Sequence, residues 1–349
     1  MPPDIKTAKE QLAIQVKRYE MLSLLSDAAI DAHIEKWLGG FEEYCGDWFG
    51  EREAVVLLEA TSRAIQLGMF DEQRVNRLKV KIVRLRPFVD APDLSDPCWS
   101  WLSLQDAGSS QTILVRNLPG SGKSPSSANH LVYLDDGLFT GDTLRRDISK
   151  WFNEFQPRNA KLVIVYLFAD EVALKSAGND LKRLFGDEVQ FRMFAGLRIT
   201  DELGLGSSVF SNDVLERGPL RLFPTKQIYD SEHLKSYRRR FGEQRKYHQG
   251  LFLPDSTTMN DNLLGGDGHR YVITRAFLEA GAKVLMGTAA PNYRLRPLGY
   301  GVTPNLGHGS FAMTSRRCPN TAPLVMWWGG SQNRALRNWH PLLPRMAET

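Results

Sequence analysis

The sequence has few cysteines and no long apolar run. Its three cysteines, Cys45, Cys98 and Cys318, are far apart and odd in number, so we expect no disulfide framework and a reducing cytoplasm. No Cys-x-x-Cys or His-x-x-x-His pair occurs, which argues against a structural zinc site. The longest apolar stretch, residues 162–169, is too short to span a membrane. The polar opening residues lack the apolar region of a signal peptide. We therefore expect a cytoplasmic protein that does not act in a membrane.

Composition places the chain among soluble globular proteins. Of its residues, 42% are hydrophobic and 24% are charged, as in soluble globular proteins. The length of 349 residues is enough for one large domain or two ordinary domains. The formal net charge is only +4. A balance this mild permits an anionic ligand without requiring a nucleic-acid partner.

The first 90 residues follow a helical pattern. Val55, Leu58 and Ile65 form one apolar stripe between Glu51 and Leu67, and residues 74–85 repeat the pattern. The segment RPFVDAPDLSDP then holds three prolines and is typical of a linker. The sequence predicts a helical region over 1–95 and a second domain over 96–349.

Beyond the linker the pattern alternates between strands and helices. Apolar runs predict strands, and amphipathic stretches between them predict helices. Two successive strand–helix–strand units predict an α/β fold with a parallel sheet, whose ligands bind at the carboxyl ends of the strands. The expected strands are 99–104, 131–134, 162–168 and 189–195, and the expected helices are 143–155 and 172–185.

The stretch from Leu131 to Thr143, LVYLDDGLFTGDT, holds the clearest functional pattern. An apolar strand leads to the acidic pair Asp135 and Asp136, then to a small-residue turn that opens a helix. The free backbone N–H groups of such a turn form a site for phosphate. Carboxylates repel phosphate but suit the hydroxyl groups and Mg²⁺ around a sugar phosphate. The alternative is an ordinary α/β loop with two exposed Asp residues.

This stretch resembles the loop that binds phosphoribosyl pyrophosphate (PRPP) in type I phosphoribosyltransferases. The resemblance implies that Asp135 and Asp136 are catalytic residues that hold the ribose hydroxyls. It also implies that they interact with Mg²⁺ indirectly, through the bound PRPP. Three positions depart from the family pattern. Gly137 replaces a branched apolar residue, Phe139 stands where Thr or a base-like Asp is common, and Asp142 replaces a small or basic residue. The implied phosphate-binding residues are Gly137, Leu138, Phe139, Thr140, Gly141, Asp142 and Thr143.

Two further loops have weaker matches to the same family. QDAGSSQ, residues 105–111, offers Gly108 and Ser109 for pyrophosphate, although a plain polar turn explains it equally well. NLPGSGKS, residues 117–124, is similar to a Walker A loop but has Asn where the first glycine belongs, and no long helix follows. We interpret it instead as a basic lid that brings Arg116 and Lys123 to pyrophosphate.

Two segments nearer the C-terminus are open to a functional and a structural interpretation. LKSYRRRFGEQRKYH, residues 234–248, mixes basic and aromatic residues and suits nucleic acid or a pyrophosphate lid, but a solvated helix face is favoured. GGDGHRY predicts a helix over 269–280 with Asp267 as N-cap and Gly281 as its end. The functional alternative for this segment is a second phosphate or base pocket, but the cap is favoured. His269 and His308 could be acid/base groups, but hydrogen-bonded structural histidines are favoured.

The C-terminal run, CPNTAPLVMWWGG followed by NWHPLLPR, carries three tryptophans that we expect in a core. Together with the acidic loop and GGDGHRY, it resembles PRTase-CE, a phosphoribosyltransferase-like family of bacterial conflict systems. The resemblance implies an effector in antiphage operons, including retrons. It also implies a partner, either a reverse transcriptase with its RNA–DNA product or another defence-system subunit.

The sequence thus predicts a type I phosphoribosyltransferase-like parallel sheet flanked by helices, with an N-terminal helical layer and a C-terminal hood. The expected activity is transfer or hydrolysis at C1 of PRPP or a related ribose phosphate, with Mg²⁺ neutralising charge on the leaving pyrophosphate. Two alternatives stay open: a non-catalytic sensor of PRPP or nucleotides, and a nucleic-acid-binding subunit.

Overall fold

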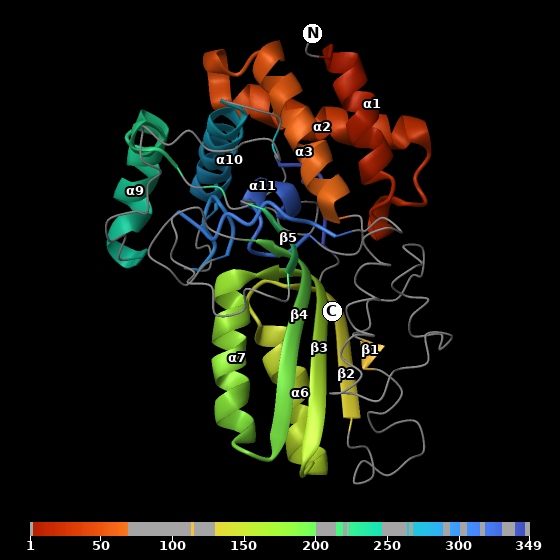
Figure 1. The fold of residues 1–349 in the computed structure, drawn as a ribbon. Helices are drawn as coiled ribbons and strands as arrows, with labels where there is room; N and C mark the ends of the chain where they lie inside the picture. Colours follow the sequence, from red (N-terminus) through yellow and green to blue (C-terminus); the bar gives the residue numbers. More distant parts are fainter. Residues whose placement is uncertain are drawn as a thin grey trace. The chain divides into compact units, whose positions relative to one another are not determined.

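A computed structural model shows two compact units, which are described separately (Figure 1). One unit holds residues 1–68 and 220–349, and the other holds residues 69–219. The structure describes residues 3–68, 113–114, 130–199, 214–218, 222, 224–245, 264, 268–288, 294–300, 306–314, 318–329 and 339–345.

The unit of residues 69–219, called the central unit because it is the middle part of the sequence, contains a five-stranded sheet in the order β1-β2-β3-β4-β5. Strands β2 to β5 are parallel, and the short β1 pairs antiparallel with β2. The predicted parallel α/β sheet is therefore confirmed. The strands are β1 Ile113–Leu114, β2 His130–Leu138, β3 Ala160–Asp170, β4 Val189–Ile199 and β5 Val214–Gly218.

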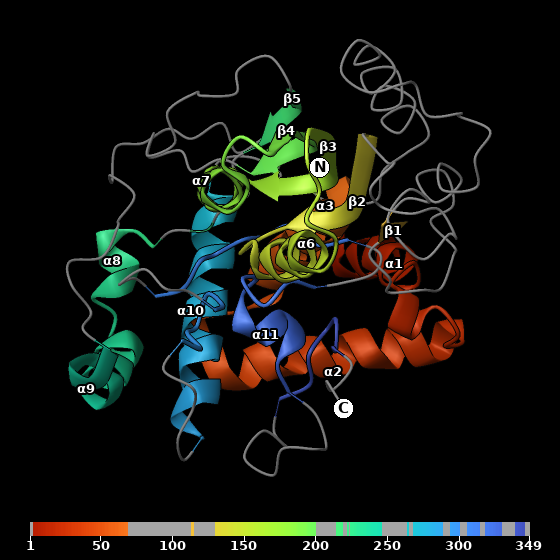
Figure 2. The same cartoon turned by 90° about the horizontal axis from the view of Figure 1, so that it is seen from below.

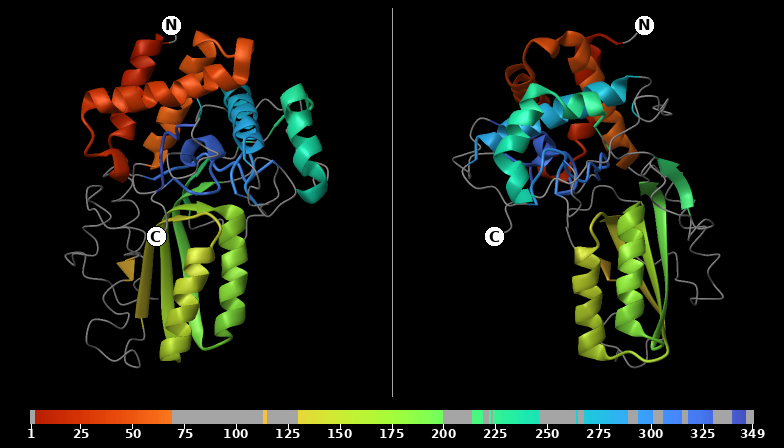
Figure 3. Two further views of the ribbon diagram at one scale, coloured as in Figure 1. Left: turned by 180° about the vertical axis from the view of Figure 1, so that it is seen from behind. Right: turned by 90° about the vertical axis from the view of Figure 1, so that its left-hand side faces the viewer.

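Two helices cover one face of this sheet, α6 (Asp142–Phe155) and α7 (Glu171–Phe185) (Figure 3). Each connects neighbouring parallel strands in the same direction along the sheet, and the fixed hand of such crossovers places both helices on one face. Leu144, Ile148 and Trp151 of α6 are buried in the shared core. Helix α6 ends at Gln156, which takes the left-handed conformation just before Pro157.

The strands extend beyond their predicted ends. The prediction ended the first parallel strand at Leu134, whereas β2 continues to Leu138 because its pairing with β3 continues through Gly137 and Leu138. The acidic pair thus lies within the strand. The predicted strand 99–104, the helix 74–85 and the linker lie outside the described residues.

The other unit joins the N-terminal helices to the C-terminal segment. The helix predicted over 51–67 is confirmed as α3. Helix α10 packs against both α2 and α3 (Figure 2). The described helices of this unit are α1 Ile5–Val16, α2 Asp27–Cys45, α3 Glu51–Gly68, α8 Lys226–Tyr229, α9 Glu232–Arg245, α10 His269–Met286 and α11 Leu324–Trp327, with 3₁₀ turns at Glu20–Leu22 and Gly46–Trp48. No helix in the described ranges is long and apolar enough to cross a membrane.

This grouping differs from the domain division that we predicted. The sequence assigned residues 96–349 to one domain, whereas residues from 220 onward belong to the same unit as the N-terminal helices. Aromatic packing explains the association: the Trp339 ring lies 5.2 Å from that of Phe41, and its Nε1 donates to the carbonyl of Val325 at 2.9 Å. Of the three tryptophans predicted to form a core, Trp327 and Trp339 are buried and Trp328 is half-buried. The role of the C-terminal segment as a hood stays a prediction.

The observed helix α10 differs in two details from the helix predicted at GGDGHRY. Its N-cap is Gly268, in the left-handed conformation with φ 84°, instead of Asp267. The helix also continues through Gly281 to Met286. A Cβ at residue 281 would lie 2.9 Å from the Cα of Pro297. Glycine is therefore needed here for close packing and does not end the helix.

A pair of histidines attaches the C-terminal segment to α2. His33 Nε2 lies 2.7 Å from the carbonyl oxygen of Leu342, and His340 Nε2 lies 2.7 Å from His33 Nδ1. A carbonyl only accepts, so His33 Nε2 carries its proton and Nδ1 accepts from His340. Burial lowers the pKa of His33, and burial together with the neighbouring His33 lowers the pKa of His340 to about 4. The pair is therefore neutral at pH 7.

We expect this pair to make folding sensitive to acid. Between pH 6.5 and pH 4 the unfolded chain protonates His340 while the folded chain does not, so the free energy of unfolding falls as the pH falls. The loss should be on the order of 2 kcal/mol, after allowance for partial exposure of the ring. Urea unfolding at pH 7, 5.5 and 4 measures it. His340→Gln should have a shallower pH dependence, and identical curves for the two proteins would contradict the assignment.

Residues 234–245 of the basic segment lie in α9, and two of its arginines have structural contacts. Arg238 stacks 3.7 Å from the centroid of the Tyr229 ring. Arg240 donates to the carbonyls of Met286, at 2.5 Å, and Thr288, at 3.4 Å, at the C-terminal end of α10. Arg240 is exposed, as the prediction of a solvated helix face requires, and it also closes the end of α10, whereas Arg238 is half-buried and covers an aromatic ring.

Arg240→Ala is expected to lower the free energy of unfolding by about 1 kcal/mol, since a cation at a helix C-terminus is lost. Arg239→Ala removes the same charge from an exposed neighbour and should change stability by less than about 0.5 kcal/mol. Chemical denaturation of both variants gives the comparison. Equal effects of the two changes would show that the contacts of Arg240 contribute nothing.

Candidate functional site

The candidate site begins on β2, where two further residues follow the acidic pair before the strand ends. Asp135 pairs in register with Tyr166 of β3, and its side chain is largely buried, with the residue 5% exposed. Asp136 is the next residue of the same strand. Burial of this extent leaves Asp135 little surface for direct contact with a ligand and suits it to hold neighbouring groups in place.

Two of the departures from the phosphoribosyltransferase pattern compensate for one another. A Cβ at Gly137 would lie 2.4 Å from an edge carbon of the Phe139 ring. The Phe139 ring therefore occupies the space that a branched residue at 137 would fill, and Phe139 is 7% exposed. The position where the family often has Thr or Asp thus holds a packed aromatic side chain that cannot accept a proton.

The turn after β2 presents the start of α6. Gly141 is the N-cap, with φ 80°, and makes no side-chain cap. The backbone N–H of Asp142 donates to Thr140 Oγ1 at 3.4 Å. The N–H groups of Thr143 and Leu144 have no carbonyl of their own helix within reach, whereas the N–H of Arg145 donates to the carbonyl of Gly141 at 2.9 Å. Thr140 and Thr143 are half-buried and Asp142 is exposed, so the turn is accessible to a ligand. The phosphate-binding role of this end of the loop stays a prediction.

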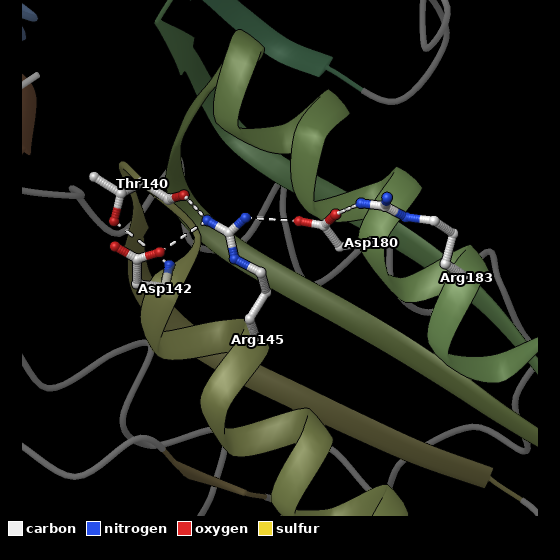
Figure 4. A network of polar contacts seen from close by, with 5 residues as sticks. All are labelled: Thr140, Asp142, Arg145, Asp180 and Arg183. Carbon is white, nitrogen blue, oxygen red and sulfur yellow. Dashed lines mark hydrogen bonds and ion pairs between the residues drawn. The ribbon is translucent and has the colours of Figure 1, made fainter. Parts of the chain in front are cut away.

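Arg145, which the sequence prediction missed, is hydrogen-bonded to two residues of this turn. Arg145 Nη2 donates to the carbonyl of Thr140 at 2.7 Å and to Asp142 Oδ1 at 2.9 Å, while Nη1 donates to Asp180 Oδ2 of α7 at 2.6 Å (Figure 4). Asp180 also pairs with Arg183. The bond from Arg145 is the main reason that the pKa of Asp180 lies below its usual value.

One local signal in the sequence points to Arg145. The N-terminus of a helix carries partial positive charge, so an arginine in the first turn of α6 is unfavourable unless an anion compensates it. Asp142 supplies part of this compensation at three residues' distance. Asp180 is 35 residues away from Arg145, and only the packing of α6 beside α7 brings the two together.

The other predicted site residues lie outside the described residues. These are Gly108 and Ser109 of the first loop, and Arg116 and Lys123 of the second. Their proposed contacts with pyrophosphate stay predictions. The strand β1, between the two loops, pairs with β2 through Ile113 and Leu114, so it reaches the same sheet as the acidic pair.

The helical unit contains a separate pocket of about 900 Å³. Its walls come from the starts of α1, α3 and α10 and include Ile5, Glu51, Val55 and His269. None of the predicted phosphate-binding residues lines this pocket.

The two loop histidines named in the sequence prediction are hydrogen-bonded. His269 Nδ1 lies 3.1 Å from the carbonyl of Leu264, and His308 Nδ1 lies 2.8 Å from Ser310 Oγ. The expectation of hydrogen-bonded histidines is thus met.

No group of three His, Cys, Asp or Glu side chains in the described ranges has the arrangement of a metal centre. The two buried thiols, Cys45 and Cys318, are free, and burial holds the pKa of each far above its usual range.

Comparison with known proteins identifies the family. No curated protein and no solved structure matched the chain. One family model, PRTase-CE, matches residues 49–345. The match begins near the start of α3 and runs through the acidic loop, the basic helix and the C-terminal tryptophans. Because this range covers most of the sequence, the chain belongs to the phosphoribosyltransferase-like PRTase-CE family.

Proposed function

We propose that the protein binds PRPP, or a related ribose phosphate, and catalyses transfer or hydrolysis at ribose C1. The observation that carries the proposal is the uncapped start of α6 at Gly141, directly after a parallel strand that bears Asp135 and Asp136. The backbone from 137 to 143 would hold the 5-phosphate through its N–H groups. The acidic pair would hold the ribose hydroxyls, with Asp135 acting mainly by position. A type I phosphoribosyltransferase-like architecture is part of the same proposal.

Mg²⁺ fits this site as a companion of the ligand. The acidic pair supplies oxygen donors, the type that Mg²⁺ prefers, but too few for a cage built by the protein alone. PRPP oxygens would complete the coordination. Bound Mg²⁺ would stabilise negative charge on pyrophosphate as its bond to C1 breaks.

The chain's own residues would orient the sugar for this step. With the phosphate held at α6 and the hydroxyls at the end of β2, C1 is presented to an attacking acceptor or water, and charge builds on the leaving pyrophosphate. Arg116 and Lys123 are proposed to stabilise that charge. The packed ring of Phe139 offers no general base at its position, so deprotonation of the acceptor would fall to another group.

The family resemblance supports a further proposal about setting. We propose that the activity serves antiphage defence, as a toxic effector that depletes PRPP or nucleotides. A partner, such as a reverse transcriptase with its RNA–DNA product or another subunit of the system, would hold the effector inactive.

Incubation of the purified protein with PRPP and Mg²⁺, followed by mass spectrometry, tests the activity. We expect release of pyrophosphate together with a ribose 5-phosphate product. ATP serves as the control, because the Walker-like segment lacks its first glycine, and should remain intact. Absence of both binding and turnover of PRPP would contradict the proposal.

A non-catalytic PRPP sensor is the second candidate, and Phe139 is the observation that favours it. A buried aromatic residue at the base-like position preserves a binding loop without its proton acceptor. Binding of PRPP by calorimetry without release of pyrophosphate would select this alternative.

A further inference from the structure

We propose that Asp142 is an internal competitor for the ligand phosphate, and that Arg145 becomes a phosphate ligand when Asp142 is displaced. The inference rests on the proposed function, because it concerns the same loop. Arg145 contacts Thr140, Asp142 and Asp180 (Figure 4). The inference gives Arg145 a role in setting the affinity of the loop for phosphate.

Arg145 is held at the loop independently of Asp142. Asp180 accepts from Nη1 at 2.6 Å, and this carboxylate is itself fixed by Arg183 on the next turn of α7. The carbonyl of Thr140 accepts from Nη2 at 2.7 Å. These two contacts come from different elements, α7 and the turn, so they define the position of the guanidinium plane without any contribution from Asp142.

Asp142 is the weakest partner of the three. Its side chain is 73% exposed, compared with 21% for Asp180, and its bond to Nη2 is 2.9 Å long. An exposed ion pair of this kind contributes little, because water and salt screen it. Asp142 can therefore turn outward at low cost, whereas Asp180 cannot leave the guanidinium as easily.

Release of Asp142 frees a hydrogen-bond donor next to the turn. Nη2 carries two hydrogens, and its two acceptors are Thr140 O and Asp142 Oδ1. When Asp142 departs, one N–H becomes available beside the N–H groups at the start of α6. A phosphate carries more charge than a carboxylate and has three acceptor oxygens, so it would replace Asp142 there and add the helix-end interactions.

Calorimetric titration of Asp142→Asn with ribose 5-phosphate and with PRPP tests the inference. The Asn side chain keeps the shape of Asp but removes the charge that competes for Arg145. Affinity should rise by roughly two- to tenfold, and the gain should shrink at high salt. Glu154→Gln is the matched control, since it removes one exposed negative charge at the far end of α6 and should leave affinity unchanged.

A second pair of variants separates competition from simple charge repulsion. The freed donor exists only when Arg145 is present, so Asp142→Asn should gain less in an Arg145→Ala background. A gain that is undiminished without Arg145, or an affinity of Asp142→Asn equal to that of the parent, would overturn the inference. Thermal unfolding of every variant shows whether the turn is still folded. If Arg145→Ala does not fold, an affinity of Asp142→Asn equal to that of the parent still overturns the inference.

The outcomes also separate this inference from the proposed function. If the parent binds ribose 5-phosphate and PRPP but Asp142→Asn binds no better, the function stands and the competition is absent. If neither protein binds either compound, the loop holds no phosphate and both proposals fail. Binding by Asp142→Asn where the parent shows none would indicate a site that Asp142 closes.

Discussion

Asp135→Asn and Asp136→Asn are each expected to weaken PRPP binding or turnover by about ten- to a hundredfold. Asp136→Asn removes a negative charge that is proposed to hold the ribose hydroxyls and, through PRPP, Mg²⁺. Asp135→Asn removes a buried charge that is proposed to act mainly by position. A charge-assisted hydrogen bond contributes roughly 1.5–3 kcal/mol. The measurement is calorimetry with PRPP and Mg²⁺, together with pyrophosphate release. The double variant should abolish any toxicity of the protein in cells. Thr140→Ala should have less effect, since backbone N–H groups around it remain.

The burial of Asp135 requires a stability control for this experiment. Asp135 is 5% exposed, so part of any loss in Asp135→Asn can come from local structure. Chemical denaturation of both single variants separates the two contributions. Asp187→Asn, in the exposed turn between α7 and β4, is a charge-matched control that should behave as the parent. The proposed ribose site is absent if the double variant folds normally, binds PRPP as the parent does and retains full activity.

Gly137→Val is expected to destabilise the central unit by about 1–3 kcal/mol, because the new side chain overlaps the Phe139 ring. Phe139→Thr should cost about 2–4 kcal/mol through lost burial. The double variant restores a branched residue and a hydroxyl at these positions. Its loss should be smaller than the sum of the two single losses by about 1–3 kcal/mol, since the valine fills the space that the ring leaves.

Urea denaturation of the four proteins measures this coupling. Gly178→Ala, on α7, is the control, because a Cβ there would lie 3.8 Å from Met193 Sδ, an ordinary contact distance. It should be tolerated. Additive losses in the double variant would show that the two departures are independent. If turnover of PRPP rises in the double variant, the threonine at 139 has regained a role in catalysis.

Several features of the fold were predictable from the sequence because their causes are local. Apolar runs predicted β3 and β4, and helical spacing of Leu144, Ile148 and Trp151 predicted α6. The resemblance to the phosphoribosyltransferase loop assigns Gly141 to the phosphate-binding turn, and the structure shows it with φ 80°, a conformation that glycine adopts readily. Such signals depend on neighbours within a few residues, so a single sequence contains them.

Other features depend on residues far apart in the chain. The end of β2 at Leu138 is set by its ladder with β3, and Gly281 lies inside α10 because Pro297 packs against it. The C-terminal segment belongs with the N-terminal helices through contacts such as that between Trp339 and Phe41. No local pattern encodes these partners.

The sequence by itself determined the order of strands and helices, the acidic loop and the family, because periodicity and motif spacing are properties of the chain. Only the tertiary structure decided how the loop is supported. The packing of α6 beside α7 brings Asp180 to Arg145, and the folding of Phe139 over Gly137 fills the position of a missing side chain. Both arrangements depend on side-chain positions in three dimensions, since a guanidinium can pair with many carboxylates and only distance selects the one it binds.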